Sequence, residues 1–181
     1  LSEPIEYVEL SYTDSGDTSA SFWFERIERA TLPIPEDDPA HRHNFHEIIF
    51  VFGGHGRHMI DGAPADLTPF SVALIAKGQV HRFEYSSDLS LYLVRFSDDF
   101  LPAELVSATW DYHAMLFNHV GFNQTLHLPP PDAEDVIRCL DLMEHEFALG
   151  QAFQRSTALR PLLAVLGLGL GRAVEDALCP T

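Results

Sequence analysis

The segment His41–Glu47, with the sequence HRHNFHE, is the most informative part of this chain, together with Gly78–His81, which reads GQVH. Together the two segments supply histidines and a carboxylate in the order and rough spacing with which a small β-barrel gathers a metal ion or a polar ligand. The four candidate residues are His41, His43, Glu47 and His81. Alternate residues of an extended chain share a face, so the first three are predicted to point the same way.

A straight strand cannot bring these side chains together. Residues 41 to 47 would span roughly 20 Å at about 3.3 Å per residue, which is too far for one ion to bridge. We therefore predict a bend at Asn44, a residue type that tolerates turn conformations. After this bend Glu47 opens the next strand and points back at the histidines, and His81 has to arrive from a strand that faces them.

Imidazole and carboxylate donors suit a divalent transition metal such as Zn, Ni, Mn, Fe or Cu, and the sequence does not choose among them. The alternative is that the same histidines and Glu47 hydrogen-bond to each other and to water without any metal. In both cases we expect these residues to line one pocket.

The remaining histidines are interpreted by their position in the pattern. His58 shares its parity with Ile60 and either lines the cavity or lies on a surface strand. His46 has the opposite parity to Glu47 and is expected to face outward, and His55 is expected to be exposed in a glycine-rich turn. Four others have no partners by spacing and are predicted to be surface residues: His113, His119, His127 and His145.

Short extended runs at regular spacing surround these segments. Turn residues such as Gly53-Gly54 and Asp61-Gly62 separate them, and the second pair is a strong hairpin signal because both residues tolerate positive φ. This pattern predicts a mainly β fold, an antiparallel sandwich or barrel. The predicted strands are Ser21–Arg29, Phe45–Phe52, Arg57–Asp61, Ala63–Leu67, Ser71–Ala76, His81–Tyr85 and Leu89–Phe96.

After Asp98 the pattern becomes helical, so we predict a barrel over residues 1–105 and a helical region over 106–181. A short helix is expected at Trp110–Asn118. A longer helix should have Asp132 as its N-cap and end at Gly150. The last helix should begin at Ser156 or Thr157, with Pro161 in its first turn, where a missing N–H does no harm.

The last helix carries an apolar stripe with the four- and three-residue steps of a coiled coil. It either packs on its own barrel or contacts a partner chain. The stripe consists of Leu159, Leu163, Leu166, Leu170 and Val174.

Bulk composition excludes some functions. The 181 residues carry a net charge of −16, from 27 acidic and 11 basic residues, so most of the surface should repel nucleic acid and anionic membranes. The apolar run Leu162–Leu170 is too short to span a bilayer. Cys139 and Cys179 fit no ligand pattern and are expected to be reduced thiols, which points to the cytoplasm.

The spacing His41-x-His43-x3-Glu47-x5-Gly53, with Gly78-x2-His81 downstream, resembles the two cupin motifs. The longer string HRHNFHEIIFVFGGHGRHMIDG, followed by VHRFEY and LYLVRFSDDFL, is similar to the amino-terminal effector-binding domain of AraC-type transcription regulators. Within that family it looks closest to the L-rhamnose-responsive regulators. The chain departs from the motifs at Pro69-Phe70, where glycine is usual, at Ala76, where proline is usual, and after His81, where the asparagine of the enzyme-type motif is absent.

The resemblance implies a cupin-type antiparallel β-barrel followed by C-terminal helices, acting as an effector-binding and dimerisation domain. A small molecule such as a sugar would enter the barrel, and Phe45 would stack on its apolar face. The polar groups that would orient it are those of His41, His43, Glu47, His58 and His81, and all of these except His58 are the candidate metal ligands.

The same resemblance implies the partners. We expect a cytoplasmic homodimer formed through the C-terminal helix, with no membrane contact. DNA would be bound only through a helix-turn-helix domain that this chain does not contain. We expect no enzymatic activity. The alternative is a stand-alone cupin metalloenzyme, a dioxygenase or sugar isomerase, for which Glu84 and Tyr85 are the nearby acid–base candidates.

Overall fold

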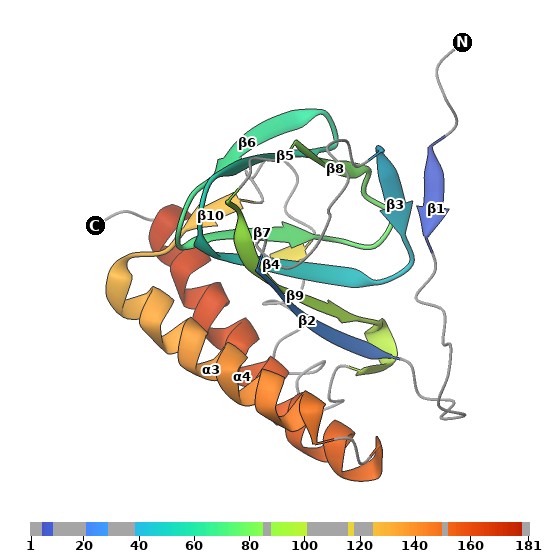
Figure 1. Ribbon diagram of the computed structural model, residues 1–181, viewed down its shortest axis with the longest axis vertical. Coiled ribbons are helices and arrows are strands. Elements are labelled where there is room, and N and C mark those ends of the chain that lie inside the picture. The colour runs from blue at the N-terminus through green and yellow to red at the C-terminus, as the bar shows by residue number, and fades with distance from the viewer. Residues whose placement is uncertain are drawn as a thin grey trace.

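The computed structural model describes residues 5–8, 21–28, 39–84, 88–100, 116–117, 125–149 and 152–178, with the backbone alone at 84, 152–155 and 177–178. Strands make up most of the described residues as far as His127, and two long helices follow them (Figure 1). The elements are β1 Glu6–Val8, β2 Phe22–Glu28, β3 His41–His43, β4 His46–Gly53, β5 Gly56–Ile60, β6 Ala63–Leu67, β7 Ser71–Ile75, β8 His81–Glu84, β9 Ser90–Phe96, the 3-10 turn η2 Asp98–Phe100, β10 Thr125–His127, α3 Pro130–Ala148 and α4 Ala152–Leu178.

The strands form two five-stranded sheets that face each other. One sheet has the order β1-β3-β8-β5-β6 and the other the order β10-β7-β4-β9-β2. Neighbouring strands run antiparallel, except that β1 is parallel to β3. Figure 1 shows α3 and α4 side by side across the outer face of the sheet that contains β4 and β9. This is the mainly β architecture with C-terminal helices that the sequence predicts.

Strand β4 is buried on both faces, and its alternation separates two apolar clusters. Ile49 and Val51 point into the space between the sheets, with Leu91 and Leu93 of the neighbouring strand β9. Ile48 and Phe50 point the other way and pack with the helices. Side chains of alternate parity in one strand therefore serve different cores, and Glu47 has the parity of the interior.

Most predicted strands are confirmed to within about one residue at each end, and Ala63–Leu67 has the predicted bounds. The Asp61-Gly62 hairpin is also confirmed, because both residues have positive φ, 48° and 82°. Strand β10 lies in the region expected to be helical, yet it pairs with β7 and completes a sheet. A three-residue strand is too short to show a period that sequence reasoning could detect.

The helix starts need correction. Helix α3 begins at Pro130 with Pro129 as its N-cap and no side-chain cap, so Asp132 lies in the first turn instead of capping it. Helix α4 begins at Ala152, ahead of Ser156, and Pro161 lies inside it. One lost backbone hydrogen bond at Pro161 is outweighed by the buried leucines that follow it. Of the short helix expected at Trp110–Asn118, only residues 116–117 are described, and they are helical.

The apolar stripe of α4 belongs to the core of this chain. All five of its residues are at most 3% exposed and pack in the cluster between the helices and the sheet. The stripe therefore packs on its own barrel. By length and composition the segment Ser156–Asp176 is apolar enough to cross a membrane, so the expectation from the shorter run Leu162–Leu170 does not hold for the whole helix. Burial of the stripe gives this apolar composition a role in packing.

Gly54, directly after β4, should be intolerant of a side chain. Its φ is +75°, and a Cβ atom there would lie 2.0 Å from the Asp88 carbonyl oxygen. We expect Gly54→Ala to lower the free energy of unfolding by more than about 2 kcal/mol, because a left-handed conformation alone costs about 1–2 kcal/mol and the backbone must also move. Urea denaturation followed by circular dichroism measures this loss.

Gly62→Ala is the matched control, because Gly62 has a φ of +82° but no atom within 4 Å of the added Cβ. It should lose only the conformational part, about 1–2 kcal/mol. Equal losses for the two variants would contradict the steric role of Gly54.

Candidate metal and effector site

The bend predicted at Asn44 is present and carries the chain from one sheet to the other. Strand β3 ends at His43, residues 44–45 form a bend, and β4 begins at His46. Strand β3 pairs with β8, whereas β4 pairs with β7 and β9. Because the two strands belong to facing sheets, His43 and Glu47 meet across the interior instead of lying along one straight strand.

His81 comes from β8, which neighbours β3 in the same sheet instead of facing it as predicted, and it meets Glu47 from across the interior. It is the first residue of β8, where its Cα pairs with that of His41. The Nε2 atoms of His43 and His81 lie 3.8 Å and 3.9 Å from the Glu47 Oε2 atom. All three side chains are at most 2% exposed, and their donor atoms lie within 4.8 Å of one another. This spacing is wide for direct hydrogen bonds and suits donors arranged around a central ion.

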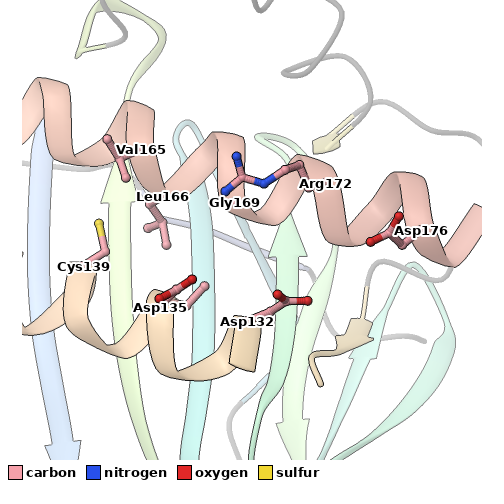
Figure 2. Close-up of a pocket in the computed structure, with 9 residues that line it drawn as sticks. Asp132, Asp135, Cys139, Val165, Leu166, Gly169, Arg172 and Asp176 are labelled. Atoms are coloured by element: carbon pink, nitrogen blue, oxygen red, sulfur yellow. The ribbon is translucent and has the colours of Figure 1, made fainter. Parts of the chain in front are cut away.

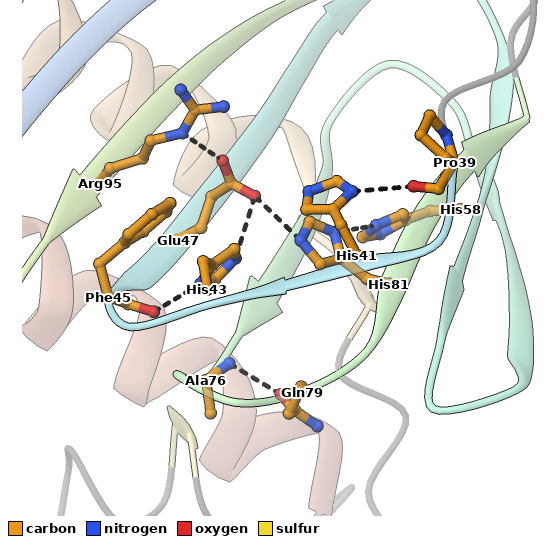
Figure 3. Close-up of polar contacts among 10 residues, drawn as sticks. All are labelled: Pro39, His41, His43, Phe45, Glu47, His58, Ala76, Gln79, His81 and Arg95. Atoms are coloured by element: carbon orange, nitrogen blue, oxygen red, sulfur yellow. Dashed lines mark hydrogen bonds and ion pairs between the residues drawn. The ribbon is translucent and has the colours of Figure 1, made fainter. Parts of the chain in front are cut away.

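Each of the three side chains, His43, Glu47 and His81, also makes a hydrogen bond to a group outside the cluster (Figure 3). The Nδ1–H of His43 donates to the Phe45 carbonyl oxygen over 2.7 Å. The Nε–H of Arg95 donates to the Glu47 Oε1 atom, also over 2.7 Å. Nδ1 of His81 is hydrogen-bonded to Nε2 of His58 over 3.0 Å. Outer contacts of this kind orient ligand side chains and set their tautomers in metal sites.

Burial and charge set the protonation of the cluster. Burial by itself raises the pKa of Glu47, but His43, the Arg95 guanidinium and His81 outweigh it, so the pKa lies well below its usual value. Burial lowers the pKa of His81 to about 3 and that of His58 to about 4, against the opposing effect of the Glu47 carboxylate. At neutral pH Glu47 is therefore an anionic carboxylate and His81 a neutral imidazole, the forms that bind metals.

The residues present fit a divalent transition metal. The Nε2 atoms of His43 and His81 are buried, and neither has a hydrogen-bond partner among the described residues. Buried ring nitrogens are normally satisfied, so two of them turned toward one carboxylate oxygen need an explanation. A cation between these atoms would supply it, with a 2-His-1-carboxylate donor set that suits Zn, Ni, Mn or Fe.

The other predicted site residues are distributed around this cluster. His41 is partly exposed and does not join the group of three. Its Nδ1–H donates to the Pro39 carbonyl oxygen, and its ring lies beside that of His81, with 4.3 Å between centroids. Phe45 is buried and stacks on the His43 ring at 3.9 Å, so one face of its ring is already covered. His58 lies in the interior and not on the surface, with 0% exposure.

His46 is not exposed, contrary to the prediction from its parity. It is 3% exposed, packs against Phe96 and Phe117, and its Nε2–H donates to the Asp98 carboxylate over 2.8 Å. Lys77 also binds Asp98, and these two bonds outweigh burial and lower the pKa of Asp98. The parity of His46 was assigned correctly, but the face it points to is covered by other parts of the chain.

Arg95 is the site residue that the sequence reasoning missed. Its Cα pairs with that of Glu47 in adjacent strands, and its guanidinium carbon lies 5.8 Å from the centre of the Phe45 ring. A signal was present, since Leu91, Leu93 and Arg95 share one parity in β9 and the two leucines are buried. A charged residue continuing an inward-facing series needs a buried partner of opposite charge.

The remaining histidine and cysteine predictions are confirmed where the structure describes the residues. His55, His127 and His145 are exposed, and Cys139 is a free thiol. Other residues of the sequence predictions lie outside the described part of the structure: His113, His119, Cys179, Tyr85 and the side chain of Glu84. Tyr85 and Glu84 are the acid–base candidates of the enzyme hypothesis.

A pocket of about 160 Å³ lies between α3 and α4, away from the histidine cluster (Figure 2). Arg172 sits in it among three exposed aspartates. Burial raises the pKa of the Cys139 thiol in its wall, so this sulfur stays protonated. The pocket holds none of the predicted site residues. Its lining is Asp132, Asp135, Val136, Cys139, Val165, Leu166, Gly169, Arg172 and Asp176.

Comparison with protein families gives one match to most of the chain. The model of the AraC-like ligand binding domain matches residues 29–163. The HTH-type transcriptional activator RhaS of Mannheimia succiniciproducens is 42% identical over 53 residues, which cover 29% of this chain and 20% of that protein. RhaS of Escherichia coli strain K12 is 36% identical over 59 residues, 32% of this chain and 21% of that protein. These matches therefore span about a fifth of the relatives' length.

Solved structures resemble the chain more distantly. The AraC-like transcriptional activator CuxR covers 73% of this chain and 42% of its own, with 12% identity and a TM-score of 0.47. The EutQ protein of Clostridium difficile covers 45% of this chain and 60% of its own, with 21% identity and a TM-score of 0.36.

Proposed function

The chain belongs to the family of AraC-like ligand binding domains, and on that premise we propose that it senses a small-molecule effector for a bacterial transcription regulator. The effector would enter the barrel and be held at the cluster of His43, Glu47 and His81. A polyhydroxylated molecule, a sugar above all, suits this cluster, because it offers hydroxyl oxygens to polar groups and C–H faces to aromatic rings.

The observation that carries this proposal is the convergence of three buried donors, each fixed by an outer partner. Such an arrangement costs stability unless something binds there, because buried polar atoms without partners are unfavourable. We infer that His43, Glu47 and His81 hold a divalent transition metal. When bound, the metal would supply positive charge and open coordination positions for effector oxygens. His41, at the partly exposed side of the cluster, would contact the effector.

Recognition here does not require catalysis. Around the cluster Arg95 is paired with Glu47 and His58 with His81, and the acid–base candidates of the enzyme hypothesis, Tyr85 and the side chain of Glu84, lie outside the described residues. The proposal is therefore a binding site whose occupancy shifts the equilibrium between two arrangements of the regulator.

Assembly follows from the same premise. Because the leucine stripe of α4 is buried in the core, a partner chain would contact the outward surface of the two helices, where Leu142 and Val165 are more than half exposed. We propose a cytoplasmic homodimer formed on that surface. The strongly acidic chain would leave DNA contact to a basic domain of the regulator outside this sequence.

A thermal-shift experiment tests the effector proposal. The purified protein is melted with a panel of sugars, with and without Zn²⁺, Ni²⁺ or Mn²⁺. A sugar present at about 100 times its dissociation constant should add about 2.7 kcal/mol of stability, and this gain should require the metal. If no combination of sugar and metal raises the melting temperature, the proposed function is wrong.

A further inference from the structure

His58 is the outer partner of His81, and it differs from the other two outer partners of the site. It extends from β5, is 0% exposed, and stacks on Phe83 with 4.3 Å between ring centroids. Its Nε2 atom lies 3.0 Å from Nδ1 of His81, and its own Nδ1 atom has no hydrogen-bond partner among the described residues. Figure 3 shows the His58 ring on the side of His81 that faces away from Glu47.

The three outer partners differ in whether they can donate a hydrogen bond, accept one, or do either. The Phe45 carbonyl can only accept, so it holds the proton of His43 on Nδ1 whatever occupies the site. The Arg95 guanidinium can only donate to Glu47. A neutral imidazole can do either, because one of its nitrogens is a donor and the other an acceptor. Of these three outer contacts, the one between His58 and His81 is therefore the one in which the hydrogen-bond donor and acceptor can exchange roles.

The charge in the site determines which imidazole donates this hydrogen bond, without and with a bound cation. Without a cation, a proton on Nδ1 of His81 would leave three lone-pair atoms facing one another, the Nε2 atoms of His43 and His81 and the Glu47 oxygen. A proton on Nε2 of His81 relieves this, since it points at the carboxylate, and His58 then donates from Nε2 to Nδ1 of His81. With a cation bound, Nε2 of His81 must be free, so its proton sits on Nδ1 and His58 accepts.

We propose that His58 is a positioning residue for His81 and that its tautomer reverses when the site takes up metal, an inference that rests on the proposed metal-assisted function. The proton of His58 moves from Nε2 to Nδ1, and that of His81 moves from Nε2 to Nδ1. Each imidazole keeps one proton, so the pair stays neutral. Metal affinity then depends on an acceptor at the position of Nε2 of His58.

Two substitutions separate this role from simple packing. His58→Phe keeps an aromatic ring against Phe83 but removes the acceptor, and His58→Gln keeps an amide oxygen that can accept near the original Nε2 position. We expect His58→Phe to weaken Zn²⁺ binding about 10–100-fold and His58→Gln to weaken it by no more than about threefold. His145→Phe, an exposed position on α3, is the control for replacing a histidine by phenylalanine.

The measurement is Zn²⁺ affinity at pH 7.5 by chelator competition, with circular dichroism to show that each variant is folded. Two-bond proton–nitrogen NMR spectra of the wild-type histidines, without and with Zn²⁺, should show the unprotonated nitrogen of His58 change from Nδ1 to Nε2. Wild-type affinity in folded His58→Phe, or an unchanged His58 tautomer on Zn²⁺ binding, would overturn this inference alone. Failure of the wild-type protein to bind Zn²⁺, Ni²⁺ or Mn²⁺ would instead overturn the metal proposal.

Discussion

Protein carrying Glu47→Gln should bind Zn²⁺ more than about 100-fold more weakly than the wild type, since even outer-contact changes cost 10–100-fold. Glu47 is the anionic member of the donor cluster, and its Oε2 atom lies 3.8 Å and 3.9 Å from the Nε2 atoms of His43 and His81. Glutamine has nearly the same shape but offers a neutral amide. His43→Ala removes a nitrogen ligand instead and should reduce binding by a similar factor. Metal content after dialysis and chelator competition both measure the loss.

The metal-free protein should also change in stability. Loss of the charged hydrogen bond between Arg95 and Glu47 should lower the free energy of unfolding of Glu47→Gln by about 1.5–3 kcal/mol. Glu144→Gln is the matched control, because Glu144 also pairs with an arginine, Arg26, but on the exposed surface of α3. That variant should keep wild-type Zn²⁺ affinity and lose little stability. Unchanged metal content in purified Glu47→Gln would contradict the assignment of Glu47 as a ligand.

Acid should destabilise the metal-free protein steeply, beginning near pH 6.5. Burial lowers the folded-state pKa of His58 to about 4 and that of His81 to about 3, whereas both titrate near 6.5 in the unfolded chain. The unfolded state therefore takes up two protons that the folded state excludes. Stability is fully present above the unfolded pKa and falls as the pH decreases toward the folded pKa. The expected slope between pH 6 and pH 4.5 is about 2.5 kcal/mol per pH unit, slightly below the limit for two protons.

Urea denaturation at a series of pH values, in the presence of a chelator, measures this slope. The low folded-state pKa of Glu47 acts in the same direction at lower pH, because its protonation in the unfolded chain further favours unfolding. In His58→Phe one of the two buried histidines is gone, so the slope should fall to about half. A free energy of unfolding that stays level from pH 6.5 to pH 4.5 would show that these imidazoles are not buried in their neutral form.

The strands and the bend were predictable because their signals are local. Paired turn residues such as Asp61-Gly62 determine where one strand ends and the next begins, and this depends on backbone conformations that few residue types adopt. The bend at Asn44 followed from chain dimensions, since an extended segment cannot bring His43 and Glu47 to one ion. Helix starts were predicted less well, because α3 begins without a side-chain cap and α4 continues through Pro161.

Parity gave the correct side for each strand residue but not what covers that side. His46 and Glu47 point in opposite directions, as the alternation requires, yet both are buried. Glu47 faces the interior between the sheets, and Phe117 helps to cover the outer face of β4 over His46. For the same reason, parity alone does not place His58 in the interior or on the surface. The alternation of residues along a strand shows which side chains share a face. It does not show whether a distant segment of the chain covers that face.

The class of fold, the position of the bend and the three side chains of the cluster, His43, Glu47 and His81, could be predicted from sequence, because alternation, turn chemistry and chain length act over a few neighbouring residues. The side chains that contact these three from outside the cluster could not be predicted, because they come from distant parts of the chain. Arg95 reaches Glu47 across 48 positions of sequence, and His58 reaches His81 across 23. These pairs depend on the register between strands, which is set by packing of the whole barrel, and that register converts three donors into an oriented site.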